Sequence, residues 1–142
     1  MPEEQDLNQK YLELQLLNQQ LQQLQEQQTL LEQQRTELLT ISKSLDDLDT
    51  VKKDSRMYAP LGGGLYVEGI ITETKKVLTN VGANVLLPKP SIETKQLVEE
   101  QVEQLIVLMQ SMEQKMKEMM RKAEQLQGEI RVQSQAAAKK TV

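Results

Sequence analysis

The sequence predicts a mainly α-helical fold, a long antiparallel coiled-coil hairpin with a small β body of two β-hairpins inserted between its helices. Two long flanking segments contain no interior proline and repeat apolar residues with a period of about 3.5, as coiled coils do. The segment between them holds five of the six glycines, and its residues alternate like strands. These observations divide the chain into a first coiled-coil helix at 1–55, a β body at 56–90, a second coiled-coil helix at 91–135 and a flexible tail at 136–142.

The composition excludes several classes of function. The 142 residues include no Cys and no His, which removes the usual zinc, haem and iron–sulfur sites together with Cys nucleophiles and His bases. The net charge is −4, and no basic cluster suits a nucleic acid. The first residues lack the features of a signal peptide, and no window approaches the roughly 18 apolar residues of a membrane span. We expect a cytoplasmic protein that is not an enzyme, holds no metal or cofactor, and binds neither nucleic acid nor membrane.

The first predicted helix is rich in glutamine. Residues 5–34 contain twelve glutamines, but leucines at heptad spacing favour a coiled coil over an aggregation-prone polar tract. Gln28 and Arg35 fall on the apolar seam, so we expect looser packing in the middle of the helix. Beyond Leu38 the pattern predicts that the seam moves to Ile41, which would disturb the supercoil locally.

The second predicted helix begins with Ser91 as its N-cap, directly after Pro90. Its seam has ten successive apolar positions without a polar break, and burying each large side chain stabilises by about 1.5–3 kcal/mol. Four of the ten are Met, which could bind a metal or a partner, although this spacing favours a packed core. The ten positions are Val98, Val102, Leu105, Met109, Met112, Met116, Met119, Ala123, Leu126 and Ile130.

Two apolar seams of similar length favour an antiparallel hairpin. If Asp54 and Glu93 meet the β body at the same level, facing positions have numbers that add to about 147. Leucines near the start of the first helix then face only residues 133–140 and lack an apolar partner within the chain. Such side chains are either frayed or form a binding surface, and the residues alone leave both open. They are Leu7, Leu12, Leu14 and Leu16.

The β body contains three consecutive glycines at 62–64. A phosphate-binding loop would continue with Gly-Lys-Ser/Thr and a helix, whereas a strand follows here, so a turn is favoured. Further turns at 72–76 and 82–83 predict two hairpins with unpaired edges, and isolated hairpins are marginal in water. The stretch therefore favours an assembly module, completed by the same stretch of another subunit. Its apolar residues are Met57, Tyr58, Leu65, Val67, Ile70, Ile71, Val77, Leu78, Val81, Val85 and Leu86.

The middle stretch resembles that of a known family. Residues 58–69 have the sequence YAPLGGGLYVEG and residues 80–84 the sequence NVGAN. With a long helix before and a returning helix after, the chain resembles prefoldin of the alpha class over nearly its whole length. The two hairpins match the alpha class, since the beta class has one, and the short chain is similar to an archaeal subunit.

The resemblance implies an ATP-independent holding chaperone. It implies that two copies pair through their β stretches and recruit four beta-class subunits into a hexamer. The ends of the coiled coils would bind unfolded client proteins and deliver them to a group II chaperonin. A structural or tethering coiled-coil protein without client holding is the alternative. The client-binding ends implied by the resemblance are Leu7, Tyr11, Leu12, Leu14 and Leu16 with Leu126, Ile130 and Val132.

Overall fold

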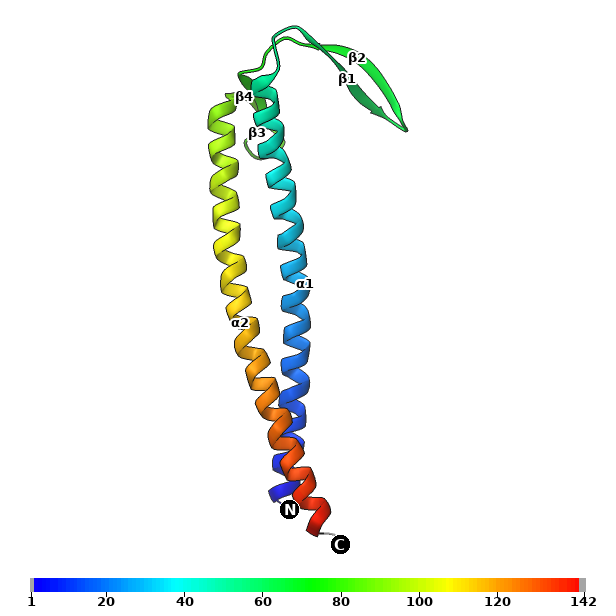
Figure 1. The fold of residues 1–142 in the computed structure, drawn as a ribbon, viewed down its shortest axis with the longest axis vertical. Helices are drawn as coiled ribbons and strands as arrows, with labels where there is room; N and C mark the ends of the chain where they lie inside the picture. Colours follow the sequence, from blue (N-terminus) through cyan, green and yellow to red (C-terminus); the bar gives the residue numbers. More distant parts are fainter. Residues whose placement is uncertain (1, 141–142) are drawn as a thin grey trace. The chain divides into compact units, whose positions relative to one another are not determined.

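Two long helices flank two antiparallel β-hairpins in the computed structural model, which describes residues 2–140 (Figure 1). Strand β1 pairs with β2 and strand β3 with β4, as two separate two-stranded sheets. The predicted fold class is confirmed. The elements are α1 (Pro2–Thr50), β1 (Ser55–Gly62), β2 (Leu65–Ile71), β3 (Lys76–Asn80), β4 (Leu86–Pro90) and α2 (Ser91–Lys140).

The helix boundaries next to the hairpins are set by local hydrogen bonds. Helix α1 ends at Thr50, and Asp54 then adopts a left-handed conformation with φ 67° and donates its backbone N–H to Ile71 O at 2.7 Å. Helix α2 follows β4 directly, and the N–H of Ser91 donates to Lys75 O at 2.7 Å. Each hairpin is thereby tied at its base to the chain next to a helix.

Helix α2 runs to Lys140, five residues past the predicted end of the second coiled-coil helix. Residues 136–138 are alanines, which have the highest helix propensity of all residues. The helix therefore continues into the segment for which the sequence favours a flexible tail. Residues 141–142 of that segment lie outside the described residues.

The chain divides into two compact units. The described part of the first unit consists of residues 2–33 of α1 and residues 106–140 of α2. The second unit is residues 34–105, which hold the end of α1, both hairpins and the start of α2.

In the first unit the two helices run antiparallel, in a register that differs from the predicted one. Asp6 contacts Gln133 and Lys10 contacts Glu129, so facing positions have numbers that add to about 140 rather than 147. The difference is one heptad, which leaves the apolar seams facing each other. The prediction of the register is wrong because α1 ends at Thr50, before the assumed meeting level.

The seam of the first unit is continuous. Buried and half-buried positions alternate every three and four residues along both helices, and Gln28 is among the half-buried ones. All seven predicted seam positions of α2 in this unit, from Met109 to Ile130, are buried or half-buried, which confirms the predicted seam. The buried apolar side chains of this unit are Leu21, Met112, Ala123 and Ile130.

In the second unit the seam continues through Ser42, which is half-buried, while Ile41 is 44% exposed. The predicted shift of the seam to Ile41 is therefore wrong, because the helix keeps its heptad phase and accepts a small polar residue. Val98 is buried, and Lys95 forms an ion pair with Asp46 across the two helices. The hydrogen bond that Lys95 donates to Asp46 raises the pKa of Lys95 above its ordinary value.

The core of the single chain is thin. No side chain among residues 2–139 is fully buried, and every buried apolar residue described lies on a helix rather than a hairpin. None of the described helices contains a stretch long and apolar enough to cross a membrane.

Candidate functional site

The first hairpin, β1 with β2, has one face that is apolar except for Ser55 at its base. Tyr58 pairs with Glu68 and Ala59 with Val67, and side chains of adjacent residues point to opposite faces. This face has no charged residue, and it is formed by Ser55, Met57, Ala59, Val67, Gly69 and Ile71. The opposite face is mixed, and its members are Arg56, Tyr58, Pro60, Tyr66, Glu68 and Ile70, with an ion pair between Arg56 and Glu68 at 3.7 Å.

The turn of the first hairpin requires its glycines. Gly62, Gly63 and Gly64 have φ values of 102°, 59° and 81°, in the left-handed region where a side chain is strained. The predicted turn is confirmed at this position. Leu61 and Leu65 flank the turn and are both exposed.

The second hairpin, β3 with β4, contacts the start of α2 through one face only. The hydroxyl groups of Thr79 and Thr94 are joined by a hydrogen bond of 3.1 Å, and Thr94 is buried. Val77 and Thr79 share this face and are half-buried. Leu78 and Leu86 lie on the opposite face and are exposed.

Most of the predicted assembly residues are therefore exposed in the single chain. Ile71 and Val77 are half-buried, and the other nine are exposed. Three other exposed apolar residues of the hairpins were not among the predicted ones, namely Leu61, Tyr66 and Leu87. Strand alternation places Tyr66 on the mixed face, opposite to the face of Val67.

The eight residues predicted to bind clients divide into two groups. Leu7, Leu14 and Leu126 are half-buried and Ile130 is only 7% exposed, so these four lie on the seam between the helices. The predicted overhang of Leu7 and Leu14 is wrong, because the register differs by one heptad and places them beside α2. The four exposed residues, which we call the tip residues, are Tyr11, Leu12, Leu16 and Val132.

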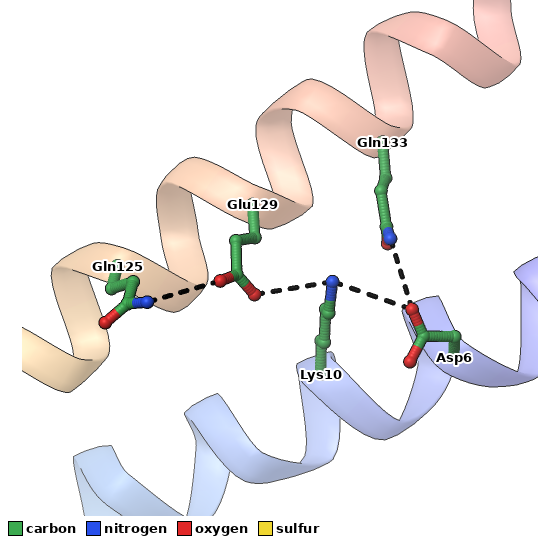
Figure 2. A network of polar contacts seen from close by, with 5 residues as sticks. All are labelled: Asp6, Lys10, Gln125, Glu129 and Gln133. Carbon is green, nitrogen blue, oxygen red and sulfur yellow. Dashed lines mark hydrogen bonds and ion pairs between the residues drawn. The ribbon is translucent and has the colours of Figure 1, made fainter.

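A polar network joins the two helices of the first unit (Figure 2). Lys10 occupies a seam position, and its Nζ lies 3.3 Å from Glu129 Oε2 and 3.6 Å from Asp6 Oδ2. Gln133 Nε2 donates to Asp6 Oδ2 at 3.1 Å, and Gln125 Nε2 donates to Glu129 Oε1 at 3.4 Å. The hydrogen bond from Gln133, with the charge of Lys10, lowers the pKa of Asp6 below its ordinary value.

Sequence reasoning missed this network. Its members lie in segments more than one hundred residues apart, so they become neighbours only once the register is known. The signal available in the sequence is Lys10, a charged residue at a position where the heptad pattern calls for an apolar one.

Two hollows open on the surface, and Gln125 and Glu129 line both of them. The first, which we call the Leu16 hollow, has a volume of about 380 Å³ and contains the side chains of Leu16, Leu17 and Leu126. The second has a volume of about 460 Å³ and is lined by Gly128 and Val132 among others. A Cβ on Gly128 would meet no atom within 4 Å, so the missing side chain leaves this hollow open.

The described residues include no group of three or more Asp and Glu side chains that could hold a metal ion.

Comparisons with known proteins agree on one family. A family model for prefoldin subunits matches residues 17–136. A protein named prefoldin subunit alpha from Methanococcus aeolicus is 33% identical over 85 residues, which cover 60% of this chain and 57% of that protein. The protein of the same name from Methanocorpusculum labreanum is 32% identical over 104 residues, 71% of each chain. The match thus spans little more than half of the first relative and over two thirds of the second.

A solved structure has the same fold. A chain in the cryo-electron microscopy structure of filamentous PFD from Methanocaldococcus jannaschii superimposes with a TM-score of 0.71 at 22% sequence identity. The alignment covers 82% of this chain and 97% of that chain.

Proposed function

Because this chain belongs to the prefoldin family, we propose that it acts as an alpha-class subunit of a cytoplasmic holding chaperone. In this function it binds unfolded proteins without ATP and delivers them to a group II chaperonin. The observation that carries the proposal is that exposed large apolar side chains gather on the hairpins of the second unit and among the tip residues of the first. Surface of this kind marks a site of protein–protein interaction.

The hairpins are the proposed assembly surface, with a second copy of this chain and four beta-class subunits as partners. Two-stranded hairpins are marginal on their own and leave the outer edge of each strand unpaired. The apolar face around Met57 and Val67 has no charged residue, so a partner could cover it without burying an unpaired charge.

The tip residues are the proposed client-binding surface. Tyr11, Leu12, Leu16 and Val132 surround one end of a helix pair whose backbone hydrogen bonds are satisfied within the helices. Contact with a client therefore depends on side chains, which fits apolar segments of many sequences. Several such ends acting on one client raise the effective concentration, so weak contacts suffice.

The client surface is tested with a triple variant, Tyr11→Ser, Leu12→Ser and Leu16→Ser, in the assembled complex. The measurement is light scattering from an unfolded test protein without ATP. We expect the variant to lose most of the protection that the unchanged chain gives.

The matched control is Leu30→Ser, Val107→Ser and Leu108→Ser, which removes three comparably exposed apolar side chains from the same unit. It should protect as well as the unchanged chain. Equal protection by both triple variants would move the client surface away from the tip residues. No protection by any form of the complex would favour a tethering coiled coil.

The assembly surface is tested on two neighbouring residues of β2. Val67→Lys places a charge on the apolar face of the first hairpin, whereas Tyr66→Lys places it on the mixed face. Native mass should fall for Val67→Lys and persist for Tyr66→Lys. A deletion that replaces residues 57–88 by a Gly/Ser turn should abolish assembly while the helical circular dichroism remains. Assembly of the deleted chain to the native mass would refute this role.

A further inference from the structure

The Leu16 hollow has charges of opposite sign at its two ends. Its apolar floor is formed by Leu16, Leu17 and Leu126. In the observed register Glu129 lies at the level of Lys10 and lines one end of the hollow, and Glu13 lies about one turn further along α1, in the same half of the hollow. Lys122 lies in the other half, at the level of Leu17. An apolar centre with one acidic and one basic end selects for a ligand with the complementary arrangement.

The charges at the two ends are available to a ligand. Among the described residues neither Glu13 nor Lys122 has an ion-pair partner. Glu129 is engaged by Lys10 but its side chain remains 41% exposed. A ligand with only apolar groups would leave both free charges unused, and an anionic amphiphile would bring its charge to only one of them.

The length of the hollow defines the spacing of the ligand charges. Seven residues separate Lys122 from Glu129 on α2, which is about 10 Å along the helix. An extended polypeptide rises by about 3.3 Å per residue, so about three residues span the two ends.

We propose that the Leu16 hollow binds one large apolar side chain of an unfolded polypeptide that carries a base and an acid about three residues apart. The base lies at the Glu13 and Glu129 end and the acid lies at the Lys122 end. The inference rests on the proposed function and adds to it a preference among client segments. Because an extended chain can enter the hollow in either direction, the order of the two charges along the ligand does not matter, whereas their opposite sign does.

The test uses four fluorescent peptides that differ only in a central core within the same Gly/Ser flanks. The cores are Lys-Leu-Leu-Asp, Lys-Leu-Leu-Lys, Asp-Leu-Leu-Asp and Gln-Leu-Leu-Gln. Binding to the full chain in its assembled form is measured by fluorescence anisotropy. An exposed ion pair changes affinity by about 1.4- to 5-fold, so the mixed core should bind several-fold tighter than the neutral core. Its advantage should vanish in high salt.

Charge reversal on the protein supplies the decisive comparison. Lys122→Glu makes both ends of the hollow acidic, so Lys-Leu-Leu-Lys should become the tightest of the four peptides. Lys115→Glu makes the same change of charge one heptad away, outside the hollow, and should leave the order of the peptides unchanged. Leu16→Ser removes part of the apolar floor and should weaken all four peptides.

The outcomes separate this inference from the proposed function. If the complex prevents aggregation but the four peptides bind equally, or none binds, the charge preference is refuted and the holding function stands. An unchanged peptide order in Lys122→Glu would also refute it. If the complex neither prevents aggregation nor binds any peptide, the holding function and the inference both fail.

Discussion

The ion pair between Lys10 and Glu129 offers a quantitative test of the register. Lys10→Met keeps an unbranched side chain of similar length at the seam and removes its charge. The Lys10 side chain is 21% exposed and that of Glu129 is 41% exposed, so water reaches the pair mainly from the Glu129 side. We expect the variant to show a weaker dependence of its thermal stability on salt than the unchanged chain.

The magnitude follows from the geometry. At the observed 3.3 Å the Coulomb energy is about 1 kcal/mol in water and about 5 kcal/mol at an effective dielectric constant of 20. Exposed pairs measure about 0.2–1 kcal/mol, and the partial exposure of this pair places it near 1 kcal/mol at low salt. The methionine in Lys10→Met should offset this loss, because it buries roughly one more apolar group in the seam, which stabilises by about 0.8 kcal/mol. The two proteins should therefore melt within a few degrees of each other at low salt.

High salt should separate them. At about 1 M salt the screening length falls to about 3 Å, so the unchanged chain loses most of the ion-pair energy while the variant keeps its apolar contact. Circular dichroism at 222 nm should then show a melting temperature about 2–4 °C higher for Lys10→Met.

The matched control is Lys117→Met. Lys117 Nζ lies 3.7 Å from Glu113 Oε1 in an exposed i,i+4 pair within α2. Such pairs contribute about 0.2–0.5 kcal/mol, so the control should change the salt dependence much less. If both variants behave alike, or if the unchanged chain remains more stable in high salt, Lys10 does not form the cross-helix pair on which the register rests.

Other measurements probe the glycines, the acidic end of the polar network and the seam. Gly128→Ala should stabilise the chain by about 1 kcal/mol, because the new Cβ meets no atom within 4 Å. Gly63→Ala should destabilise it, because Gly63 has a φ of +59°. Equal changes of melting temperature in the two variants would contradict this. The pKa of Asp6 is lowered from its ordinary 3.8, so its stabilising contribution is present above about pH 4 and lost as the pH falls through the folded-state pKa. Asp6→Asn should therefore lose less stability on acidification than the unchanged chain. The same decrease of melting temperature with falling pH in both proteins would exclude this role of Asp6. Met112→Lys places a charge at a position only 8% exposed and should cost about 3 kcal/mol, while Val107→Lys, at 65% exposure, should be nearly neutral in the same denaturation assay.

In α2 the sequence predicts which apolar side chains face the seam but not which residues of α1 they face. All ten apolar seam positions that heptad spacing predicts there are buried or half-buried, because burial follows the period of the helix. The same periodicity makes registers seven residues apart equivalent, so the pairing had to be inferred from the assumed helix ends. Helix α1 ends earlier than assumed, at Thr50, whose hydroxyl donates to Asp47 O at 2.7 Å. A local capping contact of this kind is not visible in an apolar pattern.

The candidate surfaces divide in the same way. Exposure on the hairpins could be predicted from strand alternation, since two strands cannot cover both faces of their own sheet. Exposure at the end of the helix pair could not be predicted, because the register decides whether Leu7 and Leu14 are covered by α2. The polar network around Lys10 escaped prediction for the same reason, and the two hollows depend on side-chain positions beyond any periodic pattern.

The two exposed regions differ in a way that suits them to different partners. The hairpins present strand edges, whose backbone N–H and C=O groups impose a fixed direction and spacing on a partner. Such a surface is completed by one kind of strand, which supports a defined assembly. The backbone of the helix pair is already hydrogen-bonded, so the tip residues offer only apolar side chains and the charges around the Leu16 hollow. Apolar contact is not directional, and it tolerates many sequences. The proposed function thus combines in one chain a selective surface for partner subunits and a permissive surface for clients, carried by a thin core between two helices.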